Sequence, residues 1–443
     1  NGNTSGLTYG NTTVGGSVRR TGGSYGGLGG IGSAEPTVAM VYGSFRDPNE
    51  AGSGGGSDLG PAGGGGGLIR ITAQSVVLDG QLLANGTDGS TYGGGGSGGG
   101  IKITTVSLSG NGAIRANGGN GQGQSGGGGG GRIALHFSNA SQALRTNSHA
   151  FGGGGIRSGT AGTVYYQESG SPELLVLDAG EPANAPVGTP LISLAGATNS
   201  AVDIHSLTDR RAQFPPGGLV GLILKPNASV NRTFRVISND SRTLYTDPVD
   251  GRLTDVAVVG SPYSTELAVT RLTIRRGATL ESWDGDAARR LRTGRLNAQQ
   301  VELAEFARLT HPAATADSEF GLEWQVGGLL SVDGDSSIDV GGRGYLGGLS
   351  GGNAGNQSGR TLGNTAIGGS TRRNGGSYGG LGGVGNAEST VNTVYGNHAD
   401  PAEVGSGGGS DSGLAGSGGG LVRITAGSVA LEGRIVADGG TGT

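Results

Sequence analysis

The sequence carries one long stretch twice. Residues 3–90 and residues 356–443 align without a gap at a constant offset of 353, and most aligned positions are identical. Self-similarity at a fixed period is typical of repeat architectures, in which each unit buries its apolar surface against the next. We therefore expect one full repeat followed by about a quarter of another. The second copy is predicted to be the place where the next repeat docks.

Two shorter spacings lie inside the repeat. The triplets IRI, IKI and IAL begin at residues 69, 101 and 133, a spacing of 32. The triplets LTI, VEL and LSV begin at residues 272, 301 and 330, a spacing of 29. Alternation of polar and apolar residues is typical of a strand with one buried face. Residues 286–311 fit a helix on propensity, but they follow the second of these spacings, which predicts strand.

These patterns predict an all-β protein, a parallel β-helix (β-solenoid) with glycine-rich loops and an inserted small antiparallel β module. The module is inferred from its proline content, its turn signals and its short apolar runs at 174–177, 219–224, 234–237, 244–245 and 256–259. The expected units are a glycine-rich β-solenoid part (1–165), an inserted β-sandwich or barrel-like module (166–265), the resumed β-solenoid (266–353) and the start of the next repeat (354–443).

Glycine dominates the composition, with 101 of 443 residues. The net charge of −4 and the regular apolar positions argue against disorder, and glycine is not placed at every third residue as in collagen. Two interpretations of the glycine tracts stay open. They form flexible surface loops, or they pack as extended chains in a polyproline-II-like layer, where the missing Cβ lets backbones touch.

Several classes of function are disfavoured by composition. There is no cysteine, which excludes a disulfide framework and thiolate metal ligands. No apolar run approaches the ~18–20 residues of a membrane span. No basic cluster suggests nucleic acid as a partner. The absence of an initiator methionine and of a signal peptide is expected for a mature or excised segment.

Candidate sites for chemistry are few. The five histidines (His136, His149, His205, His311 and His398) are scattered without metal-binding spacing. Asp333, Asp335 and Asp339 could offer oxygen ligands to Ca²⁺, although an Asp-Gly turn between two strands explains them more simply. We expect no enzyme, no catalytic residue and no cofactor, with Ca²⁺ as the one ion to test.

Eight asparagines stand in N-x-[ST] sequences, which are glycosylation acceptors in secreted eukaryotic proteins. In a chain rich in Asn, Ser and Thr some matches arise by composition, and these residues also suit turns. The candidates are Asn3, Asn11, Asn85, Asn139, Asn227, Asn231, Asn239 and Asn356.

In the order of its motifs, the chain resembles the giant glycine-rich tandem-repeat proteins of bacterial cell surfaces, which are also found in some eukaryotes. The motifs that carry this resemblance are GGSYGGLGG, VYG, GSGGG, LDGQLLANG, GGGGSGGGIKI, GAIRANGGNG, GGGGGGRIAL, AFGGGG and AGTVYY. The resemblance implies a long, extracellular, β-helical architecture with structural or adhesive roles, and it implies no catalytic residues.

Three functions are weighed. The first is a non-enzymatic structural protein that builds an extracellular fibre or surface filament, with neighbouring repeats of the same protein joined head-to-tail as partners. The second is a surface adhesin that binds glycan through residues 166–265. The third is a polysaccharide-active β-helix enzyme, which is disfavoured because no cluster of Asp, Lys and Arg stands on the strands.

Overall fold

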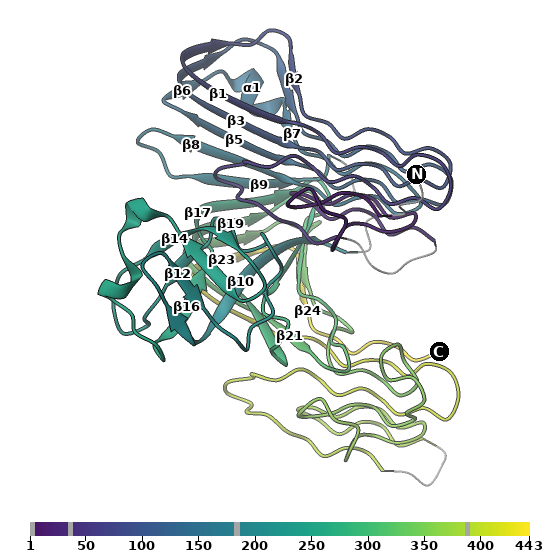
Figure 1. Ribbon diagram of the computed structural model, residues 1–443. Helices are drawn as coiled ribbons and strands as arrows, with labels where there is room; N and C mark the ends of the chain where they lie inside the picture. Colours follow the sequence, from purple (N-terminus) through teal and green to yellow (C-terminus); the bar gives the residue numbers. More distant parts are fainter. Residues whose placement is uncertain (1–4, 34–38, 181–186, 386–389) are drawn as a thin grey trace.

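The computed structural model describes residues 5–33, 39–180, 187–385 and 390–443, and in these ranges the chain is mostly β (Figure 1). The largest sheets have ten and eleven strands, and a third has three. The ten-stranded sheet contains β1 (Leu68–Val77), β3 (Gly100–Ser109), β5 (Arg132–Phe137), β6 (Asn139–Ala140), β8 (Thr163–Glu168), β9 (Leu174–Asp178), β17 (Ala268–Arg275), β19 (Leu291–Leu303), β21 (Glu319–Val332) and β23 (Val422–Leu431).

The eleven-stranded sheet contains β10 (Thr189–Thr198), β11 (Ala201–Val202), β12 (Ser206–Thr208), β13 (Ile223–Lys225), β14 (Phe234–Asn239), β15 (Thr243–Thr246), β16 (Pro262–Glu266), β18 (Thr279–Asp284), β20 (Arg308–Thr310), β22 (Ser337–Asp339) and β24 (Arg434–Val436). The small sheet contains β2 (Gln81–Leu83), β4 (Ala113–Arg115) and β7 (Ser148–His149). The helices are short: α1 (Gln142–Thr146), η1 (Pro248–Asp250) and η2 (Leu253–Asp255).

Strand pairing follows the sequence spacing. Ile69 of β1 pairs with Ile101 of β3, which pairs with Ile133 of β5, so the first spacing joins neighbouring parallel strands. In the later part, Leu272 of β17 pairs with Val301 of β19, which is the second spacing. Like residues stack on like residues, which places the apolar side chains in continuous buried rows. The two spacings therefore predicted the pairing of these strands correctly.

Within the ten-stranded sheet, the direction of the described strands reverses once, at a hairpin between β8 and β9. These two strands pair antiparallel, with Val164 opposite Val176, whereas β9 and β17 pair parallel. The connection is short and contains Gly170 with φ of +76°, a conformation that favours glycine in a tight turn. The apolar run at 174–177, which the sequence assigns to the inserted module, lies instead in the ten-stranded sheet.

The buried face of the ten-stranded sheet changes sides at the same hairpin. Val164 and Val176 pack into a core with Ile101 and Ile133, on one face of the sheet. Leu175, the neighbour of Val176, packs into the other large core, which contains Leu272, Val301 and Leu330. Because successive side chains of a strand point to opposite faces, the two cores lie on opposite sides of the sheet. Strands β8 and β9 separate them.

The glycine tracts form a layer of packed backbones. Consecutive N–H groups of one tract donate to different neighbouring segments, and the direction recurs after three residues, as in a helix with three residues per turn. The bonds of one tract are Gly94 to Gly56, Gly95 to Gly126, Gly96 to Thr87, Ser97 to Ser53, Gly98 to Gly129 and Gly99 to Ala84, with N···O distances of 2.7–3.0 Å. Figure 1 shows these segments running side by side, with the first copy near one end of the stack and the second copy near the other.

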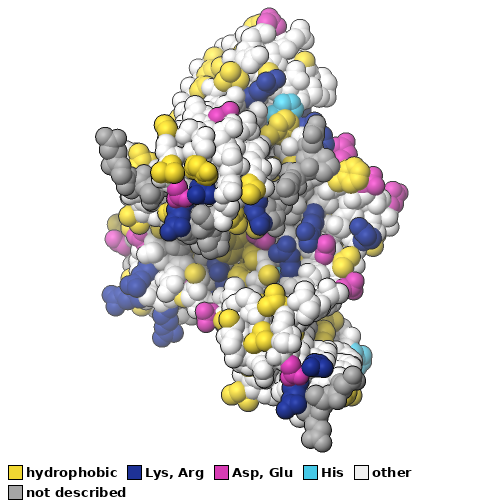
Figure 2. Space-filling model, turned by 90° about the vertical axis from the view of Figure 1, so that its right-hand side faces the viewer, with side chains coloured by type: hydrophobic (Ala, Val, Ile, Leu, Met, Phe, Trp, Pro, Cys, Tyr) yellow, Lys and Arg dark blue, Asp and Glu magenta, His cyan; other side chains and the backbone are white. Residues whose placement is uncertain are grey.

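Residues larger than glycine would not fit in these tracts. A Cβ added to Gly96 would lie 2.0 Å from the carbonyl oxygen of Gly64, and one added to Gly98 would lie 1.9 Å from that of Ala116. Of the two interpretations of the glycine tracts, the structure has the packed layer. One face of the molecule accordingly presents mostly uncharged surface, with acidic and basic side chains interspersed rather than gathered (Figure 2).

The antiparallel strands β11 to β16 form one part of the eleven-stranded sheet, here called the antiparallel sheet, which lies beside the stack (Figure 1). Strand β10 joins this sheet to the stack, because its first half pairs parallel with β18 and its second half antiparallel with β16. The expected strand at 256–259 is wrong: this segment is a turn that follows η2, and Val258 and Val259 are exposed. Within 286–311, β19 and β20 confirm the strand prediction.

Candidate assembly interface

The second copy is joined to the first repeat by strand pairing. Strand β21 pairs parallel with β23, with Trp324 opposite Ile424 and Leu330 opposite Val429. Strand β22 pairs in the same way with β24, with Ile338 opposite Ile435. Trp324 is fully buried, and its indole N–H donates to the Ser282 hydroxyl at 3.1 Å. The junction is thus built like the pairs of strands within the repeat.

The two copies of one strand are paired through opposite edges. In the first copy, Leu78 N donates to Ser109 O of the following unit at 2.8 Å. In the second copy, Glu432, the counterpart of Asp79, donates to Val332 O of the preceding unit at 2.9 Å. Alternate backbone groups of a strand point to opposite edges. Strands β1 and β23 therefore stand at the two ends of the ten-stranded sheet, each with a different edge covered.

A buried histidine lies at the centre of the junction. His311 is fully buried; its Nδ1–H donates to Pro312 O at 2.7 Å, and its Nε2 accepts from Leu421 N at 3.1 Å. Burial lowers the pKa of His311 from 6.5 to about 4, with a further contribution from the positive charge of Arg343. The neutral imidazole can accept this hydrogen bond, whereas the protonated ring cannot. His311 therefore ties the second copy to the repeat in its neutral form.

Further polar contacts hold the glycine-rich part of the second copy. The Tyr345 hydroxyl donates to Glu319 at 2.8 Å, and its backbone N–H donates to Gly405 O at 2.9 Å. The Arg360 guanidinium donates to Ala316 O at 3.0 Å, and the Asn364 amide donates to Thr315 O at 3.0 Å. The junction thus extends well beyond the two strand pairs.

The acidic residues considered for Ca²⁺ take part in turns. Asp333 accepts from the backbone N–H of Glu305 at 2.6 Å and of Asp335 at 3.2 Å. Asp339 pairs with Arg308 at 3.0 Å, and Asp335 is exposed. Within the described ranges, no three acidic, histidine or cysteine side chains gather as metal ligands would. The structure does not bring these three carboxylates together.

We expect Asp333→Ala to lower the free energy of unfolding by about 1 kcal/mol, because two backbone N–H groups lose their acceptor. Thermal denaturation of the variant measures this loss. Addition of Ca²⁺ to the unaltered chain is expected to leave the melting temperature unchanged, and a rise would show that the ion binds the folded state.

The asparagine candidates differ in exposure. Asn11, Asn85, Asn139 and Asn231 are exposed. The amide of Asn239 is buried and donates to Pro215 O and Asp240 O, so it has no room for a glycan. Two more are half-buried and held by backbone contacts, namely Asn227 and Asn356. Asn3 lies outside the described residues.

The remaining histidines stand apart from one another. His136 contacts Arg46 O at 2.9 Å, and His149 stacks on Phe151. His398 borders a hollow in the second copy. Their dispersion matches the scattered spacing noted in the sequence.

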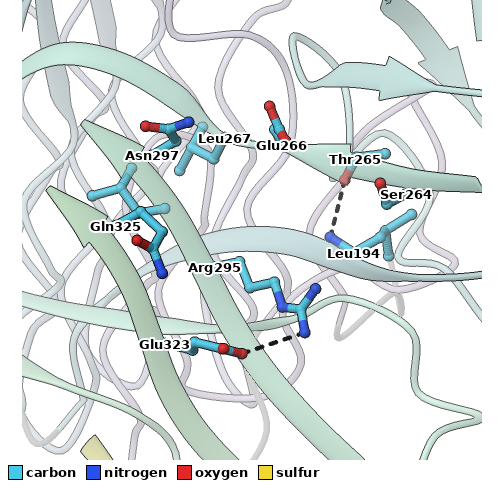
Figure 3. A pocket seen from close by; sticks show the side chains of 10 residues that line it. Leu194, Ser264, Thr265, Glu266, Leu267, Arg295, Asn297, Glu323 and Gln325 are labelled. Atoms are coloured by element: carbon cyan, nitrogen blue, oxygen red, sulfur yellow. Dashed lines mark hydrogen bonds and ion pairs between the residues drawn. The ribbon is translucent and has the colours of Figure 1, made fainter. Parts of the chain in front are cut away.

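A pocket of about 240 Å³ lies between the antiparallel sheet and the stack (Figure 3). Strands β10 and β16 form one side, and β19 and β21 form the other. Its polar groups include Arg295 and Glu323, whose charged ends lie 3.3 Å apart, together with Ser264, Asn297 and Gln325. These groups offer both hydrogen-bond donors and acceptors. None of these residues could be predicted as a site from the sequence, because the pocket forms only where two distant segments meet.

Comparisons with known protein families, with curated proteins and with solved structures returned no match. No helix in the described part of the chain is long and apolar enough to cross a membrane.

Proposed function

We propose that this chain is a non-enzymatic structural protein, a tandem-repeat β-solenoid that builds an extracellular fibre or surface filament. The observation that carries the proposal is the pairing of β1 and β23 through opposite edges. Taken together, the two copies supply this strand with a partner on both sides. An open sheet edge invites another strand, and continuation into a neighbouring repeat removes that hazard. The resemblance to surface repeat proteins supports the extracellular location.

The proposed fibre has a definite axial rise. Eight strands of the stack, β1, β3, β5, β8, β9, β17, β19 and β21, precede the copied strand β23. At ~4.8 Å per strand, one repeat adds about 40 Å.

Electron microscopy of cells that produce the chain, with immunogold labelling, tests the proposal. We expect labelled filaments outside the cell, with an axial period of about 40 Å. Isolated globular particles without an axial repeat, or label confined to the cell interior, would refute the fibre.

The second candidate function is that of a surface adhesin, favoured by the pocket beside the antiparallel sheet. Its mixture of charged and amide groups suits the hydroxyl groups of a glycan. Glycan-array binding by the unaltered chain, lost in Arg295→Ala and kept in the exposed control Arg210→Ala, would support it. If the unaltered chain and Arg295→Ala give the same binding pattern, this pocket is not the site.

A further inference from the structure

The second copy exposes a surface that the first copy buries. Leu28 is 7% exposed, whereas its counterpart Leu381 is 74% exposed; Val41 is 3% exposed, whereas Val394 is 49% exposed. Gly27, next to Leu28, shows the same contrast. A Cβ on Gly27 would meet Thr160 O at 2.3 Å, but a Cβ on its counterpart would meet nothing within 4 Å.

The contrast does not come from a difference in local fold. The rings of Tyr25 and Tyr42 lie 4.9 Å apart, and those of their counterparts Tyr378 and Tyr395 lie 5.1 Å apart. In both copies the second tyrosine donates its hydroxyl to a backbone carbonyl nine residues later, at 2.7 Å from Tyr42 and 2.6 Å from Tyr395. The same surface is therefore formed twice but covered once.

Residues of the following units cover the first copy. Gly27 N donates to Gly130 O at 2.8 Å, and Gly30 N donates to Gly127 O at 2.7 Å. Arg132, which is 7% exposed, reaches into the first copy; its Nε donates to Tyr42 O at 2.9 Å, and its guanidinium lies 5.5 Å from the centre of the Tyr25 ring. A buried arginine thus fixes the cover in place.

The second copy has a hollow where the first holds this arginine. The hollow has a volume of about 250 Å³ and is lined by Tyr378, Val394, Tyr395 and His398, among others. Its two tyrosines are the counterparts of the residues that contact Arg132 in the first copy. Glu403, the counterpart of Glu50, provides a negative charge close to Tyr378. An aromatic pair beside a carboxylate suits a guanidinium group.

We propose that this hollow is a socket for the arginine of a further copy of residues 91–168, supplied by the next repeat of the same polypeptide. The proposal rests on the tandem repetition in the proposed function and names its partner. The incoming glycine tracts lie over Leu381. The counterpart of Arg132 lies over the Tyr378 ring and donates to the backbone carbonyl of Tyr395, as Arg132 does with Tyr25 and Tyr42. The apolar surface of the second copy is the docking face for this segment.

One contact of the first copy is not repeated. Arg46 pairs with Glu173 at 2.8 Å and lies over the Phe45 ring, whereas the counterparts of Phe45 and Arg46 are His398 and Ala399. The docking of the next segment therefore depends on the arginine socket and on the glycine layer, without this outer ion pair.

Thiol reactivity tests the proposal, because the chain has no cysteine of its own. The 443-residue chain carrying Leu381→Cys is compared with the same chain lengthened after Thr443 by a copy of residues 91–168. We expect the thiol at position 381 to react about tenfold more slowly in the lengthened chain, or more slowly still. Ile367→Cys, at a position 87% exposed, is the matched control. Its counterpart in the first copy, Val14, is also exposed although that copy is covered, so the thiol at position 367 should stay reactive in both chains.

A substitution in the added segment separates the socket from the glycine layer. Replacement of its counterpart of Arg132 by Met is expected to restore at least half of the reactivity of the thiol at 381, while amide exchange shows whether the added segment stays folded. If the thiol at position 381 reacts equally fast in the 443-residue chain and in the lengthened chain that keeps its arginine, the proposal is overturned, whether the added segment is folded or not. If the thiol at position 381 is protected in the lengthened chain but no filaments are found on cells, the fibre is refuted and the docking of the next repeat stands.

Discussion

Gly128→Ala is expected to destabilise the protein by about 3 kcal/mol or more. Gly128 lies inside the glycine layer, where its N–H donates to Gly119 O at 2.8 Å and its carbonyl accepts from Gly153 N at 2.7 Å. An added Cβ would lie 1.9 Å from Gly96 O and 2.4 Å from Gly96 C. The obstacle is backbone held by its own hydrogen bonds, so the layer must separate to admit one methyl group. Urea denaturation followed by circular dichroism measures the loss.

The matched control is Gly67→Ala, at the end of another glycine tract. A Cβ at Gly67 would meet no atom within 4 Å, and this residue is exposed. We expect its free energy of unfolding to change by less than about 0.5 kcal/mol. Similar losses for the two variants would contradict the close packing of the layer.

Acidification is expected to weaken the junction between the repeat and the second copy. His311 has a pKa of about 4 in the folded protein, against an ordinary value of 6.5. Between these values the unfolded chain binds a proton that the folded chain does not, so stability falls as the pH falls from 6.5 to 4. The full loss is about 3 kcal/mol, and this group adds nothing further at lower pH.

Hydrogen exchange at the Leu421 amide is the most direct measurement, because this N–H donates to His311 Nε2. Its protection should fall as the pH is lowered through this window, after correction for the intrinsic exchange rate. In His311→Gln the side chain no longer titrates, and the fall should be absent. A fall of equal size in both proteins would assign the effect to other groups.

Much of the fold follows from sequence spacing. The two short spacings predicted which residues pair, because parallel strands in successive units place equivalent residues side by side. The second spacing also predicts strand within 286–311, against helical propensity, and β19 (Leu291–Leu303) lies there. The duplication predicts that the second copy is where the next repeat docks, which stays a prediction; the structure shows the second copy itself paired to the repeat through β23 and β21.

The reversal at β8 and β9 escaped the sequence analysis, although a signal was present. Two apolar runs, TVYYQE and LLVLD, flank SGSPE, which is a hairpin pattern. The predicted boundary between the solenoid part and the inserted module, between residues 165 and 166, falls inside β8 and divides this hairpin. The pocket at Arg295 could not be predicted, because it is formed by segments far apart in the sequence. The socket at Tyr378 is lined by residues taken from positions 378–401, but only coordinates show that these residues are uncovered in the second copy.

The glycine layer has a mechanical consequence. Tension along the stack pulls directly on the hydrogen bonds between neighbouring strands. In a sheet without such a layer, these bonds would break one strand at a time, starting from the end. In the layer, Gly94, Gly95 and Gly96 bind three different segments. A load on one tract is thereby shared among several neighbours at once, so a filament of these units should yield in blocks rather than unravel from its end.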